Sequence, residues 1–197
     1  MMLWLLRWPQ PELGLPQVLG SVQPRTSPCD YSAPVGDISV YTPIETYRGF
    51  VYPSVIDNVG HMNVQSYTGR FDEATWQFLA HLGLTPSFLK RNQRGAVAVD
   101  HHTQYRREVL AGSLLHITTQ LVALGRTSIR LVHRMYDSET GEEVATTALV
   151  GVYFDLERRA PTPLPTAVHR RATELRAARA DVVIDSSGDT EEMLAVK

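Results

Sequence analysis

The apolar positions of this 197-residue chain first follow a helical period. Val64, Tyr67, Phe71, Ala74, Phe78 and Leu82 recur at steps of three and four residues, and Arg70, Glu73 and Gln77 lie off this stripe. Such spacing places the apolar side chains on one side of an α-helix. The pattern predicts a helix from residue 64 to Gly83 and a short second helix from Thr85-Pro86 to about Asn92.

Strand patterns surround this helix. A first strand is predicted over residues 46–56, with an interruption near Pro53, and residues 96–108 form another. Three further segments alternate with a period of two. Their alternating positions are Leu115, Ile117, Thr119, Leu121 and Ala123, then Ile129, Leu131, His133 and Met135, and then Val144, Thr146, Ala148, Val150, Val152 and Phe154. The last four strands are joined by short turns, which predicts an antiparallel meander with the helix in its concave side, an α+β fold.

The chain divides into three parts. Residues 1–43 hold seven of the twelve prolines and are expected to be a disordered extension. Residues 44–160 carry the periodic patterns and form the domain. Residues 161–197 are expected to hold an Arg-rich helix around 166–179 and an acidic tail.

Composition excludes several classes of function. The net charge of −2 gives no basic surface for nucleic acid or a membrane. Cys29 is the only cysteine, which excludes a disulfide framework and fits the cytoplasm. The apolar run at residues 3–6 is too short for a signal peptide or a membrane span. A translated leader, a mis-assigned start and a short docking segment stay open.

The segment Asp57-Asn58-Val59-Gly60-His61-Met62-Asn63 carries the candidate chemistry. Its acid precedes a glycine turn that opens into the helix, so a carboxylate lies near unpaired helix N–H groups. Attack on a carbonyl needs a base or nucleophile and donors for the oxyanion. Asp is also favoured in turns and at helix starts for structural reasons. The sequence leaves open whether His61 is a general base or a packing residue. Asn63 is a residue type that suits the N-cap of the helix.

This motif, between a strand and a helix that is followed by four strands, resembles the hotdog fold, and in particular the acyl-CoA thioesterases of the 4-hydroxybenzoyl-CoA thioesterase type. The likeness covers roughly residues 46–157. It implies a long helix wrapped by a five-stranded antiparallel sheet. The segments Gly60–Gln65 and Phe71–Trp76 are also similar to thioesterases that act on betainyl-CoA. The resemblance implies that Asp57 is the catalytic carboxylate and that backbone N–H groups at Asn63, Val64 and Gln65 form the oxyanion hole.

Other residues are assigned supporting roles. Gly60, His61 and Tyr67 are expected to support the site, and Trp76 and Tyr47 to line an acyl pocket. Arg106, Arg107 and Arg158 are candidates for the phosphates of coenzyme A. If the acyl group were a quaternary ammonium, aromatic faces such as Tyr67 and Trp76 would suit it.

No metal and no cofactor are expected, since coenzyme A enters as part of the substrate. Asp100-His101-His102 superficially resembles a metal motif, but neighbouring residues of a strand point to opposite faces.

The predicted function is hydrolysis of an acyl-CoA to the free acid and coenzyme A. The alternative is a hotdog protein that binds acyl-CoA without catalysis, as a sensor or scaffold. A hotdog dehydratase would need a catalytic His paired with an acid in a His-rich segment, which the sequence lacks. A homodimer or homotetramer is expected, paired through the strand that holds Val97, Val99, Thr103 and Tyr105. The acyl group and the role of Asp57 as nucleophile or base stay open.

Overall fold

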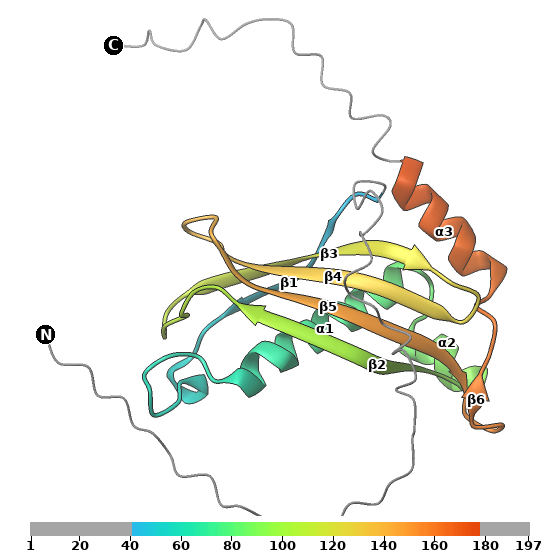
Figure 1. Cartoon of the computed structure of the whole chain (residues 1–197), viewed down its shortest axis with the longest axis horizontal. Helices are drawn as coiled ribbons and strands as arrows, with labels where there is room; N and C mark the ends of the chain where they lie inside the picture. The colour runs from blue at the N-terminus through green and yellow to red at the C-terminus, as the bar shows by residue number, and fades with distance from the viewer. Residues whose placement is uncertain (1–40, 178–197) are drawn as a thin grey trace, which may run out of the picture. The chain divides into compact units, whose positions relative to one another are not determined.

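The computed structural model describes residues 41–177. In chain order its elements are β1 (Ile44–Phe50), the 3₁₀ turn η2 (Pro53–Val55), α1 (Val64–His81), α2 (Pro86–Arg91), β2 (Arg94–Tyr105), β3 (Leu114–Leu124), β4 (Ser128–Asp137), β5 (Glu143–Asp155), β6 (Ala160–Pro161) and α3 (Thr166–Ala177). The sheet is antiparallel, and α1 runs along one side of it (Figure 1). The predictions for residues 1–40 and for the acidic tail lie outside the described residues.

The predicted long helix is confirmed, with local reasons for both of its ends. The Asn63 side chain accepts a hydrogen bond from the Ser66 N–H at 2.8 Å and caps the first turn of α1. Gly83, with φ of +88°, follows the last turn, where a residue with a side chain would be strained. The second helix is also confirmed, with Thr85 as its N-cap.

The strand order is β1-β3-β4-β5-β2, and β6 pairs with the end of β5. The predicted meander is therefore right for β3, β4 and β5 but wrong for β2. That strand pairs with β5 rather than β3, so the β1–α1–β2 connection places β1 and β2 at opposite edges. Alternation along a strand shows that it is half-buried but does not identify its neighbour.

One further strand prediction needs correction. The first strand ends at Phe50, and Pro53 begins the turn η2 instead of interrupting a longer strand. In β5 the inner row holds Ala145, Thr147 and Leu149, because Thr147 pairs with His133 and Leu149 with Leu131. Both rows of β5 are rich in apolar residues, so the sequence pattern did not distinguish them.

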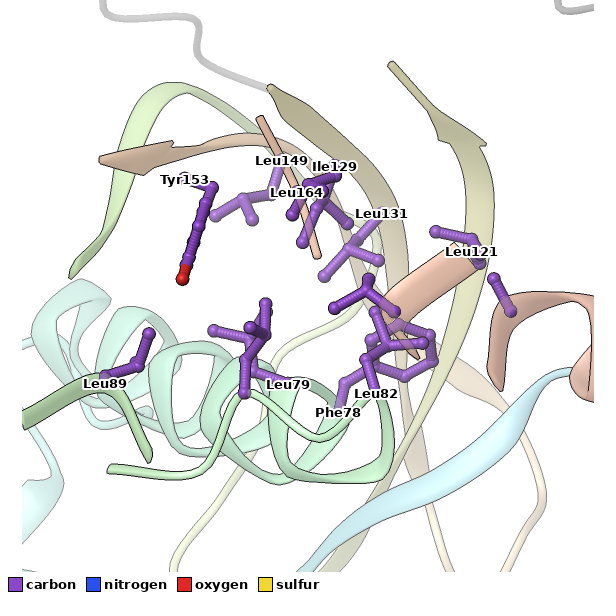
Figure 2. Close-up of a cluster of buried hydrophobic side chains, with 13 residues drawn as sticks. Phe78, Leu79, Leu82, Leu89, Leu121, Ile129, Leu131, Leu149, Tyr153 and Leu164 are labelled. Carbon is purple, nitrogen blue, oxygen red and sulfur yellow. The ribbon is translucent and has the colours of Figure 1, made fainter. Parts of the chain in front are cut away.

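The interior consists of two apolar clusters. The first cluster comprises Phe78, Leu79, Leu82, Leu84, Leu89, Leu121, Ile129, Leu131, Leu149, Tyr153, Leu164, Val168 and Ala172. Figure 2 shows its sheet residues, such as Leu131 and Leu149, opposite Leu79 of α1 and Leu82, which caps that helix. The second cluster comprises Val51, Met62, Tyr67, Phe71, Ala74, Val109, Leu115, Ile117, Met135, Val144 and Ala145.

A polar row separates the two clusters on the inner face of the sheet. It holds one side chain from each long strand: Thr46, Thr119, His133, Thr147 and Thr103. Along each strand the residue of the row lies between apolar residues, as His133 lies between Leu131 and Met135. The row therefore divides the core into an end near the start of α1 and an end near its finish.

His133 lies fully buried in this row and is neutral. The Thr75 hydroxyl donates to the Phe71 carbonyl at 2.8 Å, so its oxygen accepts from His133 Nε2 at 3.1 Å. His133 Nδ1 then accepts from the Thr119 hydroxyl at 2.7 Å. Burial lowers the pKa of His133 to about 3, because a charged imidazole there would lose its hydration.

The segment after β6 belongs to the same core. Val168 and Ala172 of α3 are buried in the first cluster, and Leu164 precedes them. Among residues 41–177, none of the helices has the length and apolar character needed to span a membrane.

Candidate functional site

The motif folds as a tight loop before α1. The Asp57 N–H donates to the His61 carbonyl at 3.0 Å, and the Gly60 N–H donates to the Asp57 carbonyl at 3.1 Å. Gly60 has φ of +97°, which explains the glycine at this position. The loop is fastened from outside, because the Met62 N–H donates to the Val109 carbonyl at 2.8 Å.

The two carboxylate oxygens of Asp57 have different surroundings. Oδ1 accepts from the Val59 N–H at 2.8 Å and closes the turn. Oδ2 lies 3.8 Å from His61 Nδ1, and the Asp57 side chain is 30% exposed. Oδ1 thus stabilises the loop, while Oδ2 stays accessible beside the imidazole of His61.

The start of α1 offers two open N–H groups. The Asn63 N–H is occupied, since it donates to the Val55 carbonyl at 3.0 Å, and the Ser66 N–H is capped by Asn63. The N–H groups of Val64 and Gln65 have no acceptor within the described part of the chain, as expected for the first turn of a helix. Of the three N–H groups that were predicted as oxyanion donors, only those of Val64 and Gln65 are therefore open.

The start of α1 faces the end of β2 across an open groove of about 370 Å³. His61, Met62, Val64 and Tyr67 line the groove on one side, and Tyr105, Arg106, Arg107 and Glu108 line it on the other. Burial raises the pKa of Tyr67 to about 12, so its phenol is uncharged at physiological pH.

The predicted phosphate-binding arginines are not equivalent. Arg106 pairs with Glu143 at 2.5 Å and Arg107 with Glu142 at 2.9 Å, so both guanidinium groups at the groove already have carboxylate partners. Arg158 follows β5 at the end of the sheet where β2 begins, because Arg94 pairs with Asp155. Within one chain it therefore lies at the opposite end of β2 from the groove.

The predicted acyl-pocket residues do not meet in one chain. Trp76 lines a separate slot of about 60 Å³ between α1 and the strands β2 and β5, with Ala96 and Gly151 in the opposite wall. Tyr47 lies on β1, at the other edge of the sheet, and packs against the second cluster.

His101 and His102 point to opposite faces of β2, as their pairing with Leu149 and Ala148 requires. Residues 41–177 contain no group of three or more side chains that could hold a metal ion.

Sequence reasoning missed three residues near the site. Tyr105 and Glu108 form the far wall of the groove, and their position depends on the pairing of β2 with β5. Arg70 was expected off the buried stripe but is only 9% exposed. Its guanidinium donates to the carbonyls of Ser66 and Phe50, at 3.1 and 3.3 Å, and so joins the first turn of α1 to the end of β1.

A family model described as the thioesterase-like superfamily matches residues 51–172, more than half of the chain. The chain belongs to this superfamily. A betainyl-CoA thioesterase from Pseudomonas aeruginosa is 28% identical over 120 residues, which cover 60% of this chain and 76% of that protein. The predicted resemblance to acyl-CoA thioesterases is thereby confirmed, as is the prediction of a thioester hydrolase.

Solved structures agree with this thioesterase-like assignment. A gentisyl-coenzyme A thioesterase has a TM-score of 0.57 and 25% identity, covering 64% of this chain and 97% of that one. A Staphylococcus aureus protein solved in complex with CoA has a TM-score of 0.65 and 14% identity, covering 80% and 98%. A 1,4-dihydroxy-2-naphthoyl-CoA thioesterase from Synechocystis has a TM-score of 0.61 and 16% identity, covering 68% and 98%. The last two likenesses show the hotdog fold alone.

Proposed function

We propose that this thioesterase-like protein hydrolyses an acyl-CoA to the free acid and coenzyme A, with Asp57 as the catalytic carboxylate. One observation carries the proposal: the Asp57 carboxylate lies in the loop before a helix whose first two N–H groups are open, with its Oδ2 3.8 Å from His61, which lines the groove. The family and the thioesterase relative support the same reaction.

In the proposed reaction the thioester oxygen accepts hydrogen bonds from the Val64 and Gln65 N–H groups. These donors stabilise the negative charge that develops on that oxygen during attack. Two routes fit Asp57. As nucleophile, its carboxylate forms a mixed anhydride, the CoA thiolate leaves and takes a proton, and water then cleaves the anhydride. As base, it takes a proton from the attacking water, and the tetrahedral intermediate collapses with loss of the thiolate.

A single turnover in ¹⁸O-labelled water tests the anhydride route. Label found in the Asp57 carboxylate by mass spectrometry would identify that route, with water attacking the Asp57 carbonyl carbon. Label found only in the released acid is the result of the base route and also of water attack on the acyl carbon of the anhydride.

His61 is proposed to position Asp57 rather than to react itself. Its ring lies 3.8 Å from Oδ2 and also lines the groove, so it can hold the carboxylate toward the substrate.

The proposal includes a homodimer, or a tetramer built from dimers. The strand β2 is twelve residues long and lies at a sheet edge, with Val97 and Val99 43% and 59% exposed. Long apolar edges of this kind are normally paired or covered. Antiparallel pairing of two β2 strands about their middle would bring the Arg158 turn of one protomer toward the groove of the other.

Sedimentation, with activity followed across a dilution series, tests this assembly. We expect activity to fall as dimers dissociate. A monodisperse, fully active monomer would contradict it.

The alternative function is a non-catalytic acyl-CoA sensor or scaffold. Incubation with a panel of acyl-CoAs, betainyl-CoA among them, separates the two through release of free thiol. Release above the uncatalysed rate supports the enzyme, and tight binding without release would overturn it. We expect activity to survive EDTA. A substrate of coenzyme A and a single cysteine, Cys29, fit a cytoplasmic protein.

A further inference from the structure

The groove beside the open N–H groups contains an aromatic corner. The rings of Tyr67 and Tyr105 lie 5.0 Å apart between centroids and are inclined by 75°. They come from α1 and β2, so the pair joins the two walls of the groove. Tyr67 is 5% exposed and holds a fixed position, whereas Tyr105 is 48% exposed and presents its ring to the groove. Near-perpendicular rings of this kind form two sides of the cages that bind organic cations.

The charges around this corner favour a cation. Arg106 and Arg107 are each paired with a glutamate, so they add little positive charge to the groove. Glu108 lines the same groove and has no ion pair among the described residues. Glu142 and Glu143 are taken up by Arg107 and by Arg106 and Arg134, so Glu108 is the groove carboxylate without an arginine partner in the described part of the chain. An anion would have to displace an existing partner, whereas a cation would meet a free carboxylate and two aromatic rings.

We propose that the corner formed by Tyr67, Tyr105 and Glu108 binds a quaternary ammonium group on the acyl part of the substrate. This inference rests on the proposed function. A quaternary ammonium group has no N–H to donate, so aromatic rings and one diffuse negative charge are the partners that suit it. Because the phenol of Tyr67 is uncharged, its ring stays a neutral wall.

The corner also limits the length of the acyl group. Tyr67 follows Val64 by three residues, which corresponds to about 4.5 Å along a helix axis. A substrate whose carbonyl oxygen meets the Val64 N–H therefore places its cation only a few bonds from the carbonyl carbon. The expected substrate is a short acyl-CoA with a trimethylammonium head.

The test compares trimethylammonioacetyl-CoA with 3,3-dimethylbutanoyl-CoA, in which carbon replaces the charged nitrogen at the same shape. For each substrate, kcat/KM is divided by the rate of hydroxide-catalysed hydrolysis, because the charge also activates the thioester chemically. We expect the wild type to prefer the cationic substrate at least tenfold after this correction.

Variants assign the preference to the corner. Tyr105→Leu is expected to reduce the normalised ratio about tenfold, Glu108→Gln about threefold, and Tyr105→Phe, which keeps the ring, less than twofold. Glu174→Gln, an exposed glutamate on α3, which packs on the first cluster, serves as the charge control and should leave the ratio unchanged. Circular dichroism checks that each variant is folded.

The outcomes separate the two proposals. Hydrolysis of both substrates at equal normalised rates would overturn the ammonium site and leave the thioesterase function standing. Loss of preference in Glu174→Gln as large as in Glu108→Gln would also overturn the site. Failure to hydrolyse either substrate, or any acyl-CoA of the panel, would instead overturn the proposed function.

Discussion

The two apolar clusters differ in the elements that cover them. At the finish of α1 the first cluster is covered by α2, through Leu89, and by α3, through Val168 and Ala172. At the start of α1 the second cluster is closed by loop residues such as Met62 and Val109, and the groove opens beside it. The two ends of α1 therefore differ in how they are covered. One end of the helix is anchored by extra elements, and the other carries the Asp57 loop on a lightly covered surface, where functional loops are usually found.

The polar row that divides the clusters should make stability depend on pH. The pKa of His133 is about 3 in the folded protein, below the ordinary value of 6.5, so the unfolded chain binds the proton more readily. The stability is therefore complete above pH 6.5 and is lost as the pH falls toward 3, by about 1.4 kcal/mol per pH unit and about 5 kcal/mol in all.

Urea unfolding at pH 7, 6 and 5 measures this loss, with His133→Gln as the non-titrating comparison. We expect the wild type to lose about 2 kcal/mol more than the variant between pH 7 and 5. Parallel pH dependence in the two proteins would show that His133 does not titrate with unfolding.

Two phenylalanines on α1 provide a matched test of the two ends. Phe78 lies in the first cluster and Phe71 in the second, and both are fully buried. Replacing either by Leu should lower the free energy of unfolding by about 1–3 kcal/mol. Only Phe71→Leu should also lower kcat/KM, by about tenfold, because it shifts the helix start that carries the open N–H groups. Equal loss of activity in both variants would remove the functional difference between the ends.

Two glycines with positive φ extend this comparison to the backbone. Gly60 lies in the motif loop with φ of +97° and Gly83 follows α1 with φ of +88°. Alanine at either position should cost about 1–2 kcal/mol of stability. A Cβ at Gly60 would meet no atom within 4 Å, so loss of turnover in Gly60→Ala would report a change of loop shape rather than a clash.

Thermal unfolding and steady-state kinetics on the glycine pair check the expectation. Gly83→Ala should keep wild-type kcat. Reduced kcat in Gly83→Ala, or unchanged kcat in Gly60→Ala, would contradict it.

Local signals were sufficient for α1 and its motif. The apolar stripe, the Asn63 cap and the glycines gave the helix within one or two residues, because each acts over one turn of chain. The neighbours of β2 and the buried row of β5 were not predictable in this way, because they depend on pairing between strands distant in sequence. The place of Tyr105 and Glu108 in the groove wall was not predictable for the same reason. The loop that holds Asp57 was predictable, whereas the opposite wall of its groove required the fold.

Asp57 is proposed to perform chemistry besides closing a turn, and one pair of variants tests this role. Asp137 closes a turn in the same manner, because its Oδ1 accepts from the Glu139 and Thr140 N–H groups, but it lies in the β4–β5 turn. Asp57→Asn and Asp137→Asn both remove a charge and keep the shape. With thiol release followed on an acyl-CoA that the wild type hydrolyses, we predict that Asp57→Asn lowers kcat by about 10²–10⁴-fold while Asp137→Asn stays near the wild type. An Asp57→Asn enzyme that stays folded and keeps more than about a tenth of the wild-type rate would contradict the claim and leave Asp57 as a turn residue.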